Sequence, residues 1–318
     1  MNKNVVVIGG GTGVFTVLTG LKKYPYNLSA VVSMSDDGGS TGILREEFGT
    51  LPPGDIRRAL VALSKTDNKI VSELFNYRFK GKGSLSGHSL GNLLITALEK
   101  ITGSFDQAVK EAVKILNVQG SVIPVTLKPT FLYAELSDGR VIKGETNIDI
   151  PKHDGSIKIG RVFLKPRVSA NPEAVRAILD ADVVILGPGD LYTSILPNLI
   201  TTDIVKAINK TKAKVVYVVN IMTKFGETYN FAASDFLKVI QEHLGDTVID
   251  YCIINTEKPT GEILARYAKD YEEPVLYDEE KVKKTKIKVM SGDYIRNGKY
   301  IRHNPQKLAK ALATIIGE

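Results

Sequence analysis

The chain has 318 residues, of which 43% are hydrophobic and 24% charged, enough for one large α/β domain or about two smaller domains. Its single cysteine, Cys252, excludes a disulfide framework and a cysteine-based metal site. The net charge of +7 fits an anionic ligand such as a phosphate ester. Basic residues are spread along the chain without a nucleic-acid recognition motif, so we expect no nucleic-acid partner. Without a membrane-span-length apolar run or a signal-peptide cleavage pattern, we expect a cytoplasmic protein.

The first predicted strand, residues 4–8, runs directly into a glycine-rich turn. This turn, Gly9-Gly10-Gly11-Thr12-Gly13, precedes an amphipathic segment over residues 14–23 that is typical of a helix. A helix N-terminus in that position offers unpaired N–H groups and a positive dipole end to a phosphate. The spacing departs from the dinucleotide fingerprint, because Val14 stands where the third glycine belongs. A nicotinamide enzyme, with Asp36 as its ribose-binding acid, and a turn without a ligand are the alternatives.

A second glycine-rich run begins where the second predicted strand, residues 28–34, ends. Asp36 and Asp37 come first, followed by Gly38-Gly39-Ser40-Thr41-Gly42. Paired carboxylates beside exposed backbone N–H groups suit a divalent cation such as Mg²⁺ that bridges to phosphate oxygens. Capping of the next turn is the alternative role for either carboxylate. We favour a site, because so many flexible residues are costly in a plain connector.

Two further motifs lie in the predicted helical stretch that follows. A helix over residues 55–64 places Arg57 near the phosphate region, with a solvated helix face as its alternative role. The sequence Gly87-His88-Ser89-Leu90-Gly91 matches the hydrolase nucleophile elbow, but no strand is predicted before it. We therefore expect a helix starting near His88, with Ser89 and Asn92 at its ligand-facing end. A histidine that only caps and packs is the alternative.

From residue 121 the pattern changes to short strands, predicted over 122–127, 131–136, 141–146 and 161–165. We expect a β-rich insert at about 121–165 within a single domain of residues 1–318. Helix and strand alternation then resumes, with strands over 182–186, 214–219 and 250–254. The predicted fold class is α/β, a Rossmann-like, doubly wound and mainly parallel sheet with this small insert.

Four polar, glycine-rich loops follow predicted strands of that sheet: residues 9–13, 36–42, 187–194 and 220–228. In an open parallel sheet such loops line the ligand crevice, so we expect one composite site. The third and fourth loops add Gly187, Gly189, Tyr192, Thr193 and Asn220 to the candidates.

Taken together, the motifs resemble the bacterial gluconeogenesis factor family, also called the uncharacterised CofD-like family, along nearly the whole chain. The family is related in fold to 2-phospho-L-lactate transferase. The matching pieces are Gly9 to Gly13, Asp36 to Gly39, Pro52 to Arg57, Gly87 to Asn92, Gly187 to Gly189, Leu191 to Ser194, Leu196 to Asn198, Gly226 to Thr228, Ala233 to Asp235 and Arg302 to Asn304.

The resemblance implies a binding protein for UDP-N-acetylglucosamine that is required for cell shape and wall synthesis during gluconeogenic growth. It carries ligand binding onto Tyr267 and Arg302. A nucleotide-dependent transferase of the phospholactate-transferase type is the alternative, and no catalytic residue is assigned. We also expect a cell-wall enzyme or regulator as partner, and a homo-oligomer. The complete expected set of nucleotide and phosphate contacts is Gly10, Gly11, Thr12, Gly13, Asp36, Asp37, Arg57, His88, Ser89, Asn92, Gly187, Gly189, Tyr192, Thr193, Asn220, Tyr267 and Arg302.

Overall fold

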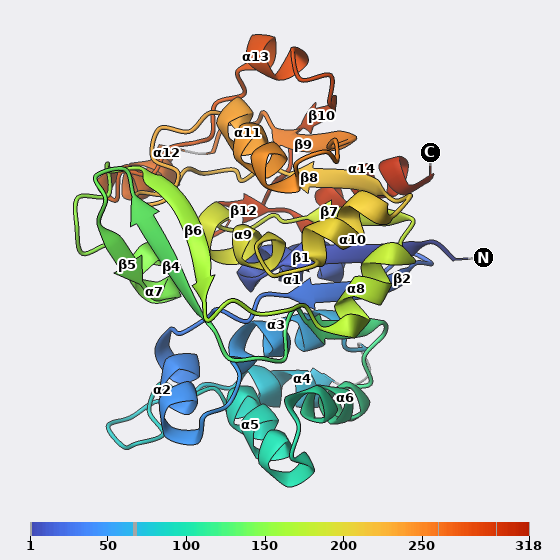
Figure 1. Cartoon of the computed structure of the whole chain (residues 1–318), viewed down its shortest axis with the longest axis vertical. Helices are drawn as coiled ribbons and strands as arrows, with labels where there is room; N and C mark the ends of the chain where they lie inside the picture. Colours follow the sequence, from blue (N-terminus) through green and yellow to red (C-terminus); the bar gives the residue numbers. More distant parts are fainter. Residues whose placement is uncertain (1, 66–68, 260, 297, 318) are drawn as a thin grey trace.

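The computed structural model describes residues 2–65, 69–259, 261–296 and 298–317. Its centre is a seven-stranded parallel sheet in the order β10-β9-β8-β7-β1-β2-β3 (Figure 1). The strands are β1 (Asn4–Gly9), β2 (Asn27–Val32), β3 (Ser121–Pro124), β7 (Val183–Leu186), β8 (Lys214–Val218), β9 (Tyr251–Asn255) and β10 (Lys288–Gly292). The apolar runs of β1, β2, β7, β8 and β9 are buried, as expected for strands that are covered on both faces, whereas the edge strand β10 is only partly buried.

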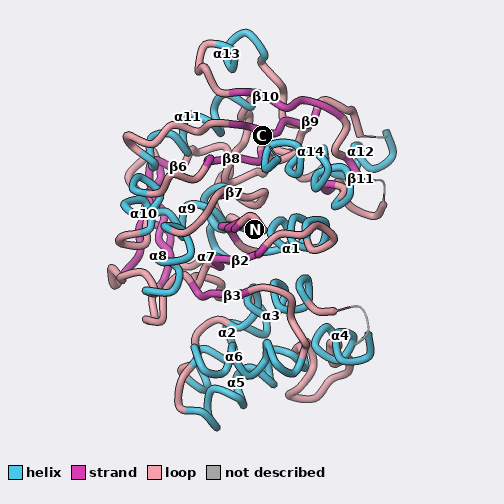
Figure 2. Tube along the Cα trace, turned by 90° about the vertical axis from the view of Figure 1, so that its right-hand side faces the viewer, coloured by secondary structure: helices cyan, strands magenta, loops and turns pink. Residues whose placement is uncertain are grey.

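Helices cover both faces of this sheet, and Figure 2 shows α1 and α14 on one side with α8, α9, α10 and α11 on the other. A further group, α2 to α6, lies beyond β3. The helices outside the insert are α1 (Gly11–Leu21), α2 (Gly39–Phe48), α3 (Pro53–Leu63), α4 (Lys69–Asn76), α5 (Leu90–Thr102), α6 (Phe105–Ile115), α8 (Pro172–Leu179), the π-helical turn η2 (Leu191–Ile195), α9 (Leu196–Leu199), α10 (Ile204–Lys210), α11 (Ala233–Leu244), α12 (Gly261–Lys269), α13 (Glu279–Lys283) and α14 (Pro305–Gly317). The predicted α/β class is confirmed.

The strand order places a topological switch between β1 and β7. From β1 the chain moves outward through β2 to β3, and it later returns to β7 on the opposite side of β1. Loops that leave neighbouring strands in opposite directions open a crevice at the carboxyl edge of the sheet. The loops after β1 and β7 therefore flank the natural ligand position of this fold.

The insert is a three-stranded antiparallel sheet in the order β5-β4-β6, formed by β4 (Phe131–Leu136), β5 (Val141–Lys143) and β6 (Ile159–Lys165). The short helix α7 (Glu145–Asp149) lies between β5 and β6 in the chain. The predicted range of 121–165 begins too early, because β3 pairs in parallel with β2 and so completes the central sheet. The insert stands at one side of the molecule in Figure 1.

A small hairpin of β11 (Ile295–Arg296) and β12 (Arg302–His303) closes one side of the carboxyl edge. Beneath it lies an apolar cluster separate from the main core, formed by Ile221, Met222, Ile295 and Ile301 with Tyr267 of α12 packed against it. The hairpin thus brings the C-terminal motif to the loop after β8. Among the described residues, no helix is long and apolar enough to cross a membrane.

Candidate functional site

The four glycine-rich loops follow β1, β2, β7 and β8, which are parallel, so all four lie at the carboxyl edge of the sheet as predicted. Two neighbouring cavities open among them and share Thr12 and Asp190. One cavity, of about 290 Å³, is lined by Arg302 and is called the arginine cavity below. The other, of about 220 Å³, is lined by five carboxylate residues and is called the acidic cavity.

The N-terminus of α1 reaches both cavities because glycine allows a very close approach between two loops. A Cβ atom at Gly13 would stand 1.7 Å from the carbonyl oxygen of Pro188, and Gly11 has a φ of +62°. The N-cap residue, Gly10, makes no side-chain hydrogen bond, and the first turn of α1 carries no acidic residue. The first N–H groups of α1 and its positive dipole end are therefore directed at the shared wall of the cavities.

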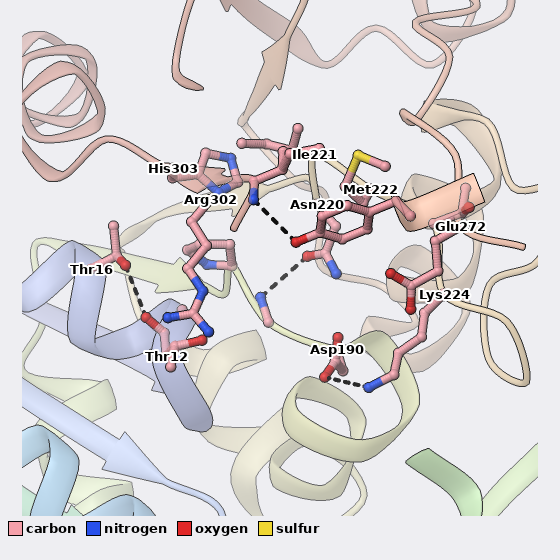
Figure 3. A pocket seen from close by; sticks show the side chains of 16 residues that line it. Thr12, Thr16, Asp190, Asn220, Ile221, Met222, Lys224, Glu272, Arg302 and His303 are labelled. Carbon is pink, nitrogen blue, oxygen red and sulfur yellow. Dashed lines mark hydrogen bonds and ion pairs between the residues drawn. The ribbon is translucent and has the colours of Figure 1, made fainter. Parts of the chain in front are cut away.

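The arginine cavity contains six of the predicted contacts: Thr12, Gly13, Gly189, Asn220, Tyr267 and Arg302. Figure 3 shows the Arg302 side chain extending toward α1, where Thr12 lies. The Tyr267 hydroxyl accepts a hydrogen bond from the backbone N–H of Ile301 at 3.1 Å, which fixes the ring beside the apolar cluster. Within the described part of the chain, Arg302 forms no ion pair. The Arg302 guanidinium lies 5.1 Å from the ring centroid of Tyr300. The cavity thus combines an aromatic, apolar end with a guanidinium that no carboxylate neutralises among the described residues.

Lys224, which no sequence motif singled out, lines the arginine cavity and pairs with carboxylates that line the acidic cavity. Its ammonium pairs with Asp149 of α7, with Asp190 at 3.2 Å and with Glu227 at 3.9 Å. Burial opposes the charge on Lys224, but the three carboxylates outweigh it and raise its pKa. Lys224 is therefore a fixed cation that joins the insert to the loops after β7 and β8.

Two carboxyl groups of the acidic cavity hold protons more tightly than usual. Burial, followed by the charge of Asp55, raises the pKa of Asp36 to about 6. Burial, followed by the charge of Asp36, raises the pKa of Glu145 to about 9, so Glu145 is protonated at neutral pH. The single guanidinium that lines this cavity among the described residues belongs to Arg58, which pairs with Asp55 at 3.1 Å. A bound cation would relieve the repulsion between Asp36 and Asp55, and their oxygens suit Mg²⁺.

Asp37 does not line either cavity. Its two carboxylate oxygens accept hydrogen bonds from the backbone N–H groups of Glu145, at 3.1 Å, and Thr146, at 2.9 Å. These are the first residues of α7, so Asp37 caps a helix that is distant in the sequence. The predicted alternative, capping of the next turn, applies to Asp36, whose Oδ1 accepts the backbone N–H of Gly38 at 3.0 Å. Asp36 and Asp55 are the two carboxylates of these motifs that face the acidic cavity.

Arg57, His88, Ser89 and Asn92, which were predicted as ligand contacts, lie in a buried network and line neither cavity. The Arg57 Nε donates to Asn92 Oδ1 at 2.9 Å, and His88 Nδ1 lies 3.1 Å from Ser40 Oγ. Burial lowers the pKa of Arg57 to about 10, so it remains charged at neutral pH. The Ser89 hydroxyl donates to a backbone carbonyl at 3.2 Å and is buried, which does not fit the exposed nucleophile of a hydrolase.

The remaining predicted residues shape the loop after β7. Glu227 is buried beneath this loop, where it accepts the backbone N–H of Tyr192 at 3.0 Å and the hydroxyl of Thr193 at 2.9 Å. Thr193 lines the acidic cavity, whereas the Tyr192 side chain is buried. Gly187 adopts a φ of +76° at the start of the loop without lining a cavity. Asp190 and Ser194 of the same loop line the acidic cavity and were not predicted.

Comparisons with known proteins agree with the resemblance drawn from the motifs. A family model described as 2-phospho-L-lactate transferase CofD matches residues 5–295. The chain is 42% identical to the gluconeogenesis factor of Bacillus subtilis (strain 168) over 316 residues, which covers 99% of this chain and 98% of that protein. It is 46% identical over 317 residues to a putative gluconeogenesis factor of Nostoc sp., covering 98% of this chain and 68% of that protein. A crystal structure of a protein from Bacillus halodurans has a TM-score of 0.93 at 42% identity, with 98% of this chain and 100% of that chain covered.

Proposed function

We propose a nucleotide-sugar-binding function from the premise that this chain belongs to the CofD family, and within it to the gluconeogenesis factors. The ligand we propose is a UDP-sugar of the UDP-N-acetylglucosamine type. Its binding regulates wall synthesis and cell shape in the cytoplasm during gluconeogenic growth, with a cell-wall enzyme or regulator as partner.

The observation that carries this proposal is the pairing of two chemistries in the arginine cavity. Tyr267, Ile221 and Met222 give one end an aromatic and apolar lining that suits a nucleobase. Arg302 and the uncapped N-terminus of α1 give the other end a guanidinium fork and free N–H groups, which suit a diphosphate. A nucleoside diphosphate carries both complementary groups in one molecule.

A divalent cation fits the same proposal. The shared residue Thr12 places the phosphate position next to the acidic cavity, where Asp36 and Asp55 repel each other. These two carboxylates would hold Mg²⁺, which would supply positive charge to the phosphate oxygens. Asp36 carries over from the predicted metal pair, and Asp55 replaces Asp37 as its partner.

Calorimetric titration of UDP-N-acetylglucosamine tests the proposal. We expect Arg302→Ala and Tyr267→Ala each to bind about ten- to hundredfold more weakly, because each loses a contact of about 1.5–3 kcal/mol. Arg176→Ala, which removes an exposed guanidinium of α8, is the matched control and should bind like the wild type. Each variant is first shown to melt like the wild type. Wild-type affinity in both cavity variants would refute the proposed ligand position.

A transferase is the second candidate, and the position of the acidic cavity favours it. This cavity continues from the phosphate end of the arginine cavity and has room for an acceptor molecule. NMR spectra of UDP-N-acetylglucosamine during long incubation with the protein separate the two functions. An unchanged ligand is expected for the regulatory binder, and conversion of the ligand would establish the enzyme.

A further inference from the structure

The outer face of the insert sheet carries aromatic and basic side chains from all three strands. Antiparallel register places Phe131 opposite Lys165, and Tyr133 opposite both Phe163 and Lys143. Side chains at alternate positions share a face, so these five residues lie together on one side of the sheet. The intervening residues Leu132, Ala134 and Leu136 of β4 and Val162 of β6 are buried on the other side. We call the five-residue surface the insert face.

The aromatic rings of the insert face already lie against one another or against cations, which leaves their edges and only part of their faces for a partner. Tyr133 and Phe163 stack with ring centroids 5.3 Å apart and planes 13° from parallel. The Arg45 guanidinium lies 4.5 Å from the Phe131 ring centroid, and the Lys143 ammonium lies 4.9 Å from it. Single-stranded nucleic acids bind through stacking of bases on free ring faces, and neighbouring rings and cations already lie over faces of Phe131, Tyr133 and Phe163 here. Ring edges carry the positive end of the aromatic quadrupole and therefore attract anionic oxygens.

The charge of the insert face points to an acidic occupant. Lys143 and Lys165 are exposed, and within the described residues neither forms an ion pair. Glu135, the next outward residue of β4, is already paired with Arg161 through hydrogen bonds of 2.8 and 2.5 Å. A symmetric dimer through this face would bring the same two lysines together and repel itself. Aromatic residues and arginine are the types enriched at protein interfaces, which favours a protein partner.

We propose that the insert face binds an acidic segment of a partner protein, in which carboxylates alternate with apolar side chains. The carboxylates meet Lys143, Lys165 and the ring edges, and the apolar side chains cover Tyr133 and Phe163. The proposal is independent of the ligand in the arginine cavity. It assigns the insert a second role, since α7 packs against the opposite side of β4 and β5 and lines the acidic cavity.

Fluorescence anisotropy with the full chain at low salt tests this surface. The probe is a labelled peptide of about twelve residues that repeats Glu-Glu-Leu, compared with an oligothymidine of equal length. We expect the peptide to bind and the double charge reversal Lys143→Glu with Lys165→Glu to weaken it about tenfold, as two exposed ion pairs would. Phe163→Leu keeps an apolar residue but removes the ring edge, and it should weaken binding about threefold.

The matched control reverses two other exposed lysines, Lys210→Glu with Lys212→Glu, at the opposite edge of the sheet, and should leave peptide binding unchanged. Three outcomes would overturn the proposal. If both double variants lost peptide binding equally, the binding would depend only on the overall charge of the protein. Tighter binding of the oligothymidine, lost with Lys143 and Lys165, would make the face a nucleic-acid surface. Self-association that is lost in the same variant, measured by light scattering, would make it a contact between copies of this chain.

Discussion

The two cavities share a wall but differ in charge. The arginine cavity has the guanidinium of Arg302, which has no ion pair among the described residues, with an aromatic ring and apolar side chains, whereas the acidic cavity has five carboxylate residues and the paired guanidinium of Arg58. Thr12 and Asp190 belong to both. Phosphate oxygens suit the first cavity directly, and they suit the second only through a cation.

The two cavities at the carboxyl edge of the sheet therefore differ in the charge of the residues that line them, and not in the loops that supply those residues. The loops after β1 and β7 contribute to both cavities, and Lys224 forms the fixed positive charge at their border. The comparison predicts that substitutions at the border change stability, while substitutions inside a cavity change ligand or cation binding.

The largest effect is expected at the border itself. Lys224→Met removes the ammonium that compensates Asp149, Asp190 and Glu227, and leaves the buried Glu227 and the partly buried Asp149 and Asp190 without their shared cation. Breaking a buried ion pair by removing one partner costs about 3–5 kcal/mol, so we expect that loss in the free energy of unfolding in urea. Lys206→Met, whose ammonium is exposed and pairs with Asp203 alone, is the control and should cost less than about 0.5 kcal/mol. If both variants lost the same free energy of unfolding, Lys224 would not be the compensating charge between the two cavities.

The second-largest effect is expected from a substitution in the acidic cavity that stabilises the folded protein. The pKa of Asp36 rises from 3.8 to about 6 on folding, mainly because the carboxyl is buried. The folded protein therefore binds this proton more tightly than the unfolded chain, and stability falls as the pH rises from about 4 through 6. Asp36→Asn removes that cost, so we expect a gain of the order of 2 kcal/mol near pH 7.5 that disappears toward pH 4. A gain that is constant across this range, measured by thermal unfolding, would contradict an ionisation effect.

The smallest effect is expected on ligand affinity, because we propose that a cation in the acidic cavity contacts the ligand in the arginine cavity. We expect the wild type to bind UDP-N-acetylglucosamine about tenfold more tightly in Mg²⁺ than in EDTA, which corresponds to about 1.4 kcal/mol. This difference should disappear in Asp55→Asn, and in the wild type it should shrink as the pH falls through about 6 and Asp36 takes up its proton. Asp37→Asn, which changes the cap of α7, should retain the difference. If the Mg²⁺ effect were lost in Asp37→Asn alone, the cation would be held by Asp36 and Asp37, the pair predicted from the sequence, and not by Asp36 and Asp55.

Five strands of the sheet, β1, β2, β7, β8 and β9, and the four loops could be predicted because they depend on local patterns, whereas β10 was not predicted. Apolar runs of four to six residues followed by glycine indicate buried strands and their ends, whatever the rest of the chain does. The start of α2 at Gly39 could not be predicted, since glycine is a poor helix former and tertiary packing overrides that preference here. The assignment of β3 to the central sheet depends equally on a distant partner, β2.

Side-chain roles were harder to predict than elements. Arg57 and Arg58 are adjacent and chemically identical, yet Arg57 is buried against Asn92 and Arg58 lines the acidic cavity. Only the packing of α4 and α5 against α3 decides between them. Lys224 lies in the predicted loop 220–228, but no pattern singled it out, because its partners Asp149 and Asp190 come from distant parts of the chain.

The opposite directions of Asp36 and Asp37 couple the cavity wall mechanically to the insert. Asp36 lines the acidic cavity, while the next residue is bonded to the first turn of α7 through two backbone N–H groups. Any shift of the backbone at these two residues must therefore move the cavity wall and the start of α7 together. α7 in turn carries Glu145 and Asp149 and supports β4 and β5. A displacement of the loop after β2 is thus passed to α7 through two parallel hydrogen bonds, and from α7 to the strands that form the outer surface of the insert.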